Sequence, residues 1–237
     1  MAEKSDVEDV VVREDVAGSE DEKWRVPVDE KHRSRVLRPW RFDRPHHRAF
    51  FFAWSSFFLA FFGWFALSPL LVDIGKASPE IGISEQEPRV TSNIVGVAGT
   101  IFMRLVIGPV ADRYGPRWAQ SVLLIVFSIP VFLVGTSRSY TQFVICRFFI
   151  GFLGAAFVVT QYWTSIMFAK TVVGAANATS AGWGNLGGGV TNALMPQFVK
   201  LCQVGGLDYD PAWRIAMVIP ASLTTLWGFL LFFFSDD

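Results

Sequence analysis

The sequence predicts an all-α membrane protein with six transmembrane helices. Hydrophobic residues make up 51% of the 237 residues, and 23 residues are phenylalanine. The apolar runs are too long for core elements of a water-soluble domain, because about 20 such residues already span a bilayer. No acidic residue lies well inside a run, since Asp73 and Asp112 only mark ends. Two cysteines are too few for a disulfide framework.

The segment before the first span, residues 1–48, is predicted to be a cytoplasmic tail in two parts. Residues 1–30 hold eleven acidic and four basic residues with few large apolar groups, which is typical of disorder. The following bases could bind nucleic acid, but they abut a hydrophobic segment, which favours an anchor at the cytoplasmic leaflet. These bases are Lys31, Arg33, Arg35, Arg38, Arg41, Arg44 and Arg48.

Residues 49–237 are predicted to form one six-helix transmembrane domain. The basic flank puts the N-terminus in the cytoplasm, and an even number of spans returns the C-terminus to the same side. The short basic loops near Arg113, Arg117 and Lys170 agree, as does the acidic loop 73–88 on the opposite side. The predicted spans are about 49–72, 89–111, 118–136, 141–168, 173–199 and 213–234.

The fifth run carries five glycines between Gly182 and Gly189. Each glycine costs a helix in water about 1 kcal/mol against alanine, but in a membrane glycines let another backbone come close. Gly184 and Gly188 are one turn apart on one face, and Asn185 lies between them. Two interpretations stay open: a tight helix seam with amides as glue, or a seam that lines a polar path with Asn185 facing a small ligand.

Arg104 is the most informative single residue. It lies eight residues before Asp112, about 12 Å along a helix, which is well inside a hydrocarbon core of about 30 Å. A cation at that depth costs at least about 2.5–3.5 kcal/mol, and the sequence offers no intramembrane carboxylate to pair with it. A mobile anion, especially a planar oxyanion, suits its planar fork. The alternative is pairing with helix-end carbonyls, or snorkelling.

Arg147 lies near the outer end of the fourth run, where snorkelling is cheap, so a structural and a functional role stay open. Phe157 and Trp163 could stack on a planar ligand, although packing is the usual role of aromatics. The three histidines all lie in the basic N-terminal run. With no metal-ligand set, nucleophile–base pair or phosphate loop, no catalytic residue, enzyme activity, cofactor or metal is expected.

Several motifs resemble known transporter signatures. Gly108-Pro-Val-Ala-Asp-Arg-Tyr-Gly-Pro-Arg117 resembles the cytoplasmic signature between helices two and three of the major facilitator superfamily, and Arg147-Phe-Phe-Ile-Gly151 its fourth-helix signature. The run Ala181-Gly-Trp-Gly-Asn-Leu-Gly-Gly-Gly189 closely resembles the fifth-helix signature of the nitrate/nitrite porters, and residues 157–168 and 212–216 are similar to high-affinity nitrate transporters of plants, algae and fungi. The first signature falls on Gly108, Asp112, Arg113, Gly115 and Arg117.

The resemblance implies transport of nitrate or nitrite by proton-coupled alternating access. Arg104 falls at the family's second-helix substrate arginine, and Phe157 at the aromatic that stacks on the anion. The fifth-helix residues Ser180, Gly182, Gly184 and Asn185 would line the same site. In such folds the site lies near the midplane, between two six-helix halves.

One departure from the family matters. The family has twelve helices, with a second arginine in the other half, whereas this sequence stops just after helix six. The resemblance therefore implies an N-terminal half, either a fragment or a half-transporter that must pair. The expected partners are nitrate or nitrite, protons, membrane lipid and a C-terminal half or pairing subunit. The expected location is the plasma membrane. The alternative is a non-transporting membrane protein that binds nitrate or a partner transporter through the fifth-helix seam.

Overall fold

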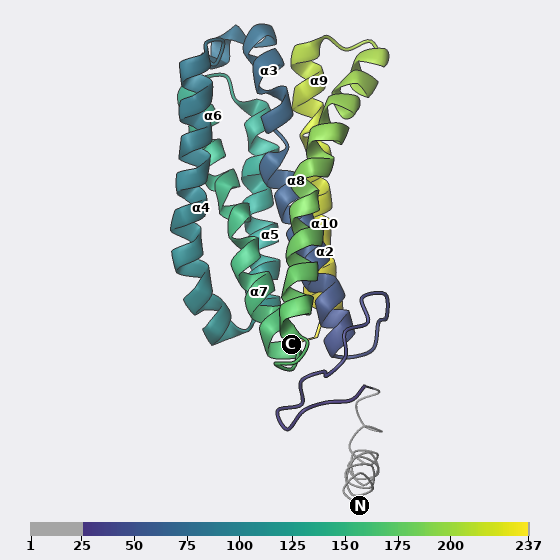
Figure 1. The fold of residues 1–237 in the computed structure, drawn as a ribbon. Coiled ribbons are helices and arrows are strands. Elements are labelled where there is room, and N and C mark those ends of the chain that lie inside the picture. Colours follow the sequence, from purple (N-terminus) through teal and green to yellow (C-terminus); the bar gives the residue numbers. More distant parts are fainter. Residues whose placement is uncertain (1–25, 237) are drawn as a thin grey trace, which may run out of the picture.

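The computed structural model describes residues 26–236, and within this range the long elements are all helices (Figure 1). Most of the predicted acidic tail lies outside the described residues. The α-helices are α2 His46–Phe65, α3 Leu71–Ala77, α4 Gln86–Tyr114, α5 Pro116–Leu133, α6 Tyr140–Ile150, α7 Ala156–Met167, α8 Val173–Val204, α9 Tyr209–Ala216 and α10 Val218–Phe234. Four 3₁₀ turns join them: η1 Ser68–Leu70, η2 Pro79–Ile81, η3 Val134–Thr136 and η4 Gly151–Ala155.

The predicted all-α membrane architecture is confirmed. In the described part of the chain, five helical segments are long and apolar enough to cross a membrane: His46–Ala77, Gln86–Tyr114, Pro116–Thr136, Tyr140–Met167 and Tyr209–Phe234. The fifth predicted span forms α8, whose 32 residues reach about 48 Å. It is not among the five because glycine, Asn, Ser and Thr dilute its apolar residues, so its crossing stays a prediction. In Figure 1 it runs the length of the bundle beside α2.

Three boundaries differ from the sequence prediction. The predicted loop 73–88 contains α3, η2 and the first residues of α4. The fourth span is interrupted by η4 between α6 and α7. The sixth is divided at Met217, because Pro220 has no N–H to donate to the Ala216 carbonyl one turn earlier.

Glycines set the closest helix crossings of the bundle. A Cβ added to Gly151 would lie 1.9 Å from the Gly96 carbonyl oxygen, and one added to Gly99 would lie 2.1 Å from that of Phe148. Neither position can hold a side chain while α4 packs this closely on α6 and η4. The 3₁₀ stretch of the fourth span therefore coincides with its contact to α4.

The two ends of the bundle have different polar contacts. We call the end with His46, Tyr114 and Ser235 the terminal end, and the end with Ala77, Gln86 and Val204 the far end (Figure 1). At the terminal end the basic segment folds back on the bundle, because the Ser34 amide donates to the Met167 carbonyl at 2.9 Å and Ala169 donates to Ser34 at 2.9 Å. Two of its arginines, Arg44 and Arg48, pair with Asp236.

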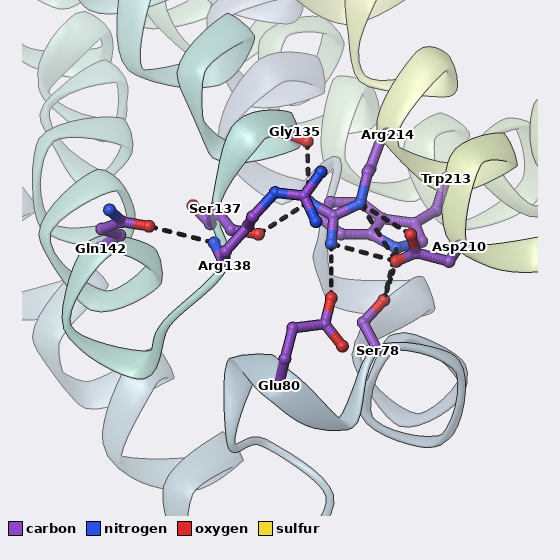
Figure 2. A network of polar contacts seen from close by, with 9 residues as sticks. All are labelled: Ser78, Glu80, Gly135, Ser137, Arg138, Gln142, Asp210, Trp213 and Arg214. Carbon is purple, nitrogen blue, oxygen red and sulfur yellow. Dashed lines mark hydrogen bonds and ion pairs between the residues drawn. The ribbon is translucent and has the colours of Figure 1, made fainter.

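The far end is closed by a polar network around Arg214 of α9 (Figure 2). Its Nε contacts both carboxylate oxygens of Asp210 at 3.0 and 3.1 Å, and its Nη2 contacts Glu80 at 2.9 Å. Its Nη1 donates to the carbonyls of Gly135 and Ser137 at 3.0 and 2.7 Å. One side chain thus joins α9 to the segments after the first and third spans.

We expect Arg214→Ala to lower the thermal stability of the purified protein in detergent. Hydrogen bonds to charged groups contribute about 1.5–3 kcal/mol each, so a loss of at least that size should appear in a thermal unfolding scan. Arg138→Ala is the matched control, because Arg138 lies at the same end and is exposed. Equal melting temperatures for the two variants would contradict a stabilising role for the network.

Candidate functional site

Arg104 lies inside α4, ten residues before the helix ends at Tyr114. Its Nε and Nη2 donate to the Gly154 carbonyl at 3.4 and 3.3 Å, which is longer than the usual 2.9–3.0 Å or so. Among residues 26–236, Arg104 forms no ion pair with a carboxylate. The helix-carbonyl pairing considered from the sequence is therefore present but weak, and a guanidinium with five N–H donors keeps capacity for an anion.

Phe157 of α7 lies next to this guanidinium. The Arg104 Cζ is 5.7 Å from the centroid of the Phe157 ring, within the range of a cation–π contact. Phe157 is half-buried, whereas Trp163 on the same helix is fully buried in a cluster with Phe50 and Phe168. The structure thus brings Arg104 and Phe157 together, while Trp163 has a packing role.

The fifth-helix glycine Gly184 supports this pair indirectly. A Cβ added to Gly184 would lie 1.8 Å from Cδ1 of Phe57 on α2. The Phe57 ring in turn packs on Phe157, with 5.7 Å between centroids. The absent side chain therefore makes room for the ring that positions Phe157. Gly188 also faces α2, so the predicted seam between helices is confirmed at both glycines.

The other proposed α8 residues lie on two different faces. Ser180 is buried and accepts a hydrogen bond from Gln161 of α7 at 3.2 Å. Gly182 and Asn185 lie on the exposed face, and Asn185 donates to its own helix at the Ala181 carbonyl, 2.8 Å away. Within the described chain the amide does not join two helices, and the seam is made by glycine.

Sequence reasoning missed a polar ladder between α7 and α8. Besides the contact from Gln161 to Ser180, the Asn177 side chain donates to Ser165 at 2.9 Å. Gln161 is one helical turn from Phe157, on the same face of α7. The sequence does carry a signal for this ladder, since an amide inside an apolar run needs a partner.

Arg147 does not snorkel, contrary to one of the roles left open for it. Arg147 is only 4% exposed, and its Nη2 donates to the side-chain oxygen of Asn93 on α4. The close crossing of α4 over α6 and η4 covers it. The sequence could not give this depth, because it depends on which helix lies against the arginine.

The signature from Gly108 to Arg117 forms the turn between α4 and α5 at the terminal end. Gly115 has a φ of 85°, which a residue with a side chain rarely adopts, and Pro116 begins α5. Arg117 donates to the Ser235 carbonyl at 3.1 Å. Asp112 and Arg113 are exposed, and apart from the adjacent backbone of its own helix nothing lies within 4 Å of a Cβ built on Gly108.

The sequence of this chain is similar to those of known membrane transport proteins. Residues 37–237 match the model of the Major Facilitator Superfamily. The chain is 37% identical over 219 residues to High affinity nitrate transporter 2.5 of Arabidopsis thaliana, covering 91% of this chain and 42% of that protein. It is 32% identical over 219 residues to Nitrate transporter 2.2 of Chlamydomonas reinhardtii, covering 88% and 41%.

A bacterial protein is similar as well. The Nitrate/nitrite transporter NrtP of Nostoc punctiforme is 31% identical over 180 residues, which cover 76% of this chain and 35% of that protein. The chain therefore spans less than half the length of these relatives.

Within the described range, no group of three or more His, Cys, Asp or Glu side chains could hold a metal ion.

Proposed function

The chain belongs to the major facilitator superfamily, a family of multi-pass membrane transporters, and we propose that it forms the N-terminal half of a nitrate transporter. In this proposal nitrate, or alternatively nitrite, crosses the membrane by proton-coupled alternating access. The names of the similar proteins support nitrate or nitrite as the substrate. Their greater length supports a second half, carried by the same polypeptide or by a pairing subunit.

One observation carries the proposal more than any other. Arg104 is a cation inside a membrane-spanning helix. Its guanidinium donates only two long hydrogen bonds, both to the Gly154 carbonyl, and lies beside the half-buried ring of Phe157. A planar anion can accept hydrogen bonds from the guanidinium fork and stack on the ring at the same time. We assign Ser180, Gly182, Gly184 and Asn185 to the same anion site, with Gly184 acting through Phe57.

Two surfaces fit the proposed second half. One side of α4 exposes an apolar stripe, in which Leu105 is 75% exposed directly beside Arg104. The open face of α8 carries Gly182, Asn185 and Gly189, which are small or polar and suit close helix contact in a membrane. The remaining members of the α4 stripe are Val90, Ile94, Val97 and Ile101.

The competing candidate is a membrane protein that binds nitrate or a partner transporter without moving the ion. The open face of α8 is the observation that favours it, because that face would also bind a separate transporter. Uptake of ¹⁵N-nitrate into proteoliposomes separates the two candidates, with the chain supplied together with its second half. Saturable uptake that rises with an inward proton gradient supports transport, whereas binding without uptake supports the alternative.

We also propose that the terminal end is cytoplasmic, in the plasma membrane, and this can be tested by labelling. Cys146 and Cys202 are first replaced by serine, and single cysteines are placed at the exposed positions Glu85 and Lys31. We expect an impermeant maleimide to label Glu85→Cys in intact cells and Lys31→Cys only after permeabilisation. Labelling of Lys31→Cys from outside, or of both from one side, would overturn this topology.

The basic segment should contribute to that orientation. Changing Lys31, Arg35, Arg38 and Arg41 to Gln leaves Arg44 and Arg48 paired with Asp236. Because positive residues beside the first span are retained in the cytoplasm, the four changes should increase the fraction of inverted molecules, measured with Glu85→Cys as the single reporter cysteine since Lys31 is itself changed. An unchanged labelling pattern would count against the orienting role of the four bases.

A further inference from the structure

A cavity lies nearer the far end of the bundle than the Arg104 site. Its volume is about 220 Å³, whereas about 10–15 Å³ of such space holds one water molecule. It is lined by Trp64 and Phe65 of α2, Ser68 of η1, Asn93 and Val97 of α4, and Arg147 of α6. The space is large enough for a small hydrated ion.

The charge balance of this cavity is one-sided. The guanidinium of Arg147 is its single charged group, and nowhere in residues 26–236 does Arg147 form an ion pair. Its Nη2 donates to the Asn93 side-chain oxygen, whereas its Nη1 donates to none of the described residues. A buried N–H of a charged group without an acceptor is costly, so an anion in the cavity would supply what the protein leaves out.

The other polar groups of the cavity are also suited to an anion. With its oxygen accepting from Arg147, the Asn93 amide has two N–H donors left, and the Ser68 hydroxyl is a further donor. No carboxylate lines the space. A cation would meet a fixed positive charge here, whereas an oxyanion or halide would meet donors and an indole ring.

The position of the cavity relates it to Arg104. Asn93, Val97, Thr100 and Arg104 follow one another by three or four residues, so they lie on one face of α4. From Asn93 to Arg104 the helix rises about 16 Å. Trp64 reaches from the cavity toward the Arg104 site, because a Cβ built on Gly154 would lie 2.9 Å from its Cζ3, and Gly154 is the residue whose carbonyl accepts from Arg104.

The geometry points to a second anion-binding site at Arg147, in which a small inorganic anion is held between the far end and the Arg104 site. Arg147 and Asn93 bind it, and Trp64 separates the two sites. The assignment of nitrate as the physiological occupant, and of a staging role on its path, rests on the proposed function. The anion site itself rests on the cavity and its unpartnered guanidinium nitrogen.

The test is a calorimetric titration with nitrate. The sample is the complete protein, this chain with its second half, in nanodiscs. The comparison is made in an Arg104→Gln background, where binding at the first site is removed. We expect about one nitrate still to bind, and the further change Arg147→Gln to weaken that binding by at least about tenfold, as expected for loss of a charged hydrogen bond. Arg138→Gln, an exposed change at the same end, should leave it unaltered.

The outcomes separate this inference from the proposed function. No binding in Arg104→Gln, or residual binding that survives Arg147→Gln, overturns the second site. A wild-type titration unchanged by Arg104→Gln but abolished by Arg147→Gln supports the second site and contradicts the proposed role of Arg104.

Because Arg147→Gln could fail to fold, a second measurement keeps Arg147 intact. Iodide quenching of tryptophan fluorescence is compared between Arg104→Gln protein and the same protein carrying Trp64→Phe, and the difference isolates Trp64. Quenching of Trp64 that saturates with iodide supports a bound anion beside it. Quenching that rises linearly without saturation overturns the site.

Discussion

Gly184→Leu is expected to prevent the chain from folding into the bundle. The first added carbon alone would lie 1.8 Å from Cδ1 and 2.4 Å from Cγ of the fully buried Phe57 ring. The Phe57 ring has little room to move, because it extends from α2 into the core between α7 and α8. We expect a loss of at least about 3 kcal/mol, the upper end of typical overpacking, seen as loss of the monodisperse peak in size-exclusion chromatography.

Gly189→Leu is the matched control, since it lies on the same helix and, apart from the adjacent helix backbone, nothing is within 4 Å of a Cβ built there. This variant of the chain alone should keep its folded yield. Gly184→Ala gives a graded case, in which displacement of Phe57 should reach Phe157 and weaken anion binding before the fold is lost. Normal folding of Gly184→Leu would mean that α8 does not pack on α2 as described.

Arg104→Gln is expected to abolish high-affinity nitrate uptake by the complete transporter. Losing one partner of a desolvated charge pair costs about 2–5 kcal/mol, or about 30-fold to several thousandfold in affinity. Arg104→Lys keeps the charge but loses the planar fork that matches an oxyanion, so we expect an intermediate loss of about tenfold to a hundredfold. The measurement is the concentration dependence of ¹⁵N-nitrate uptake.

Surface expression must be measured for each Arg104 variant, because misfolding would give the same loss. Misfolding is not expected, since Arg104 is exposed in the described chain and makes only two long bonds to Gly154. A well-expressed Arg104→Gln protein with near-normal apparent affinity would leave Arg104 as a structural charge.

Long apolar runs made most of the fold predictable, because the bilayer fixes both their length and their polarity. The breaks inside two spans were not predictable from hydropathy. One depends on the missing N–H of Pro220, and the other coincides with the contact of Gly151 to the Gly96 carbonyl. The first is visible in the sequence as a proline, but the second depends on which helix lies opposite.

The candidate site, too, could be predicted from the sequence only in part. Arg104 could be found because a charge inside an apolar run is rare and costly, and the resemblance gave Phe157. The depth of Arg147 could not be found, since its burial depends on the crossing of α4 over α6 and η4. Asn185 had two open interpretations, and only the folded chain shows that it lies away from the seam that Gly184 forms.

The most direct test of the central claim is the position of nitrate in an experimentally determined structure of the complete protein, solved with and without the ion. The account predicts planar density within about 2.7–2.9 Å of the Arg104 guanidinium nitrogens, beside the Phe157 ring, that is absent without nitrate. Arg104 bonded only to Gly154 in both structures, with nitrate bound elsewhere or not at all, would contradict it.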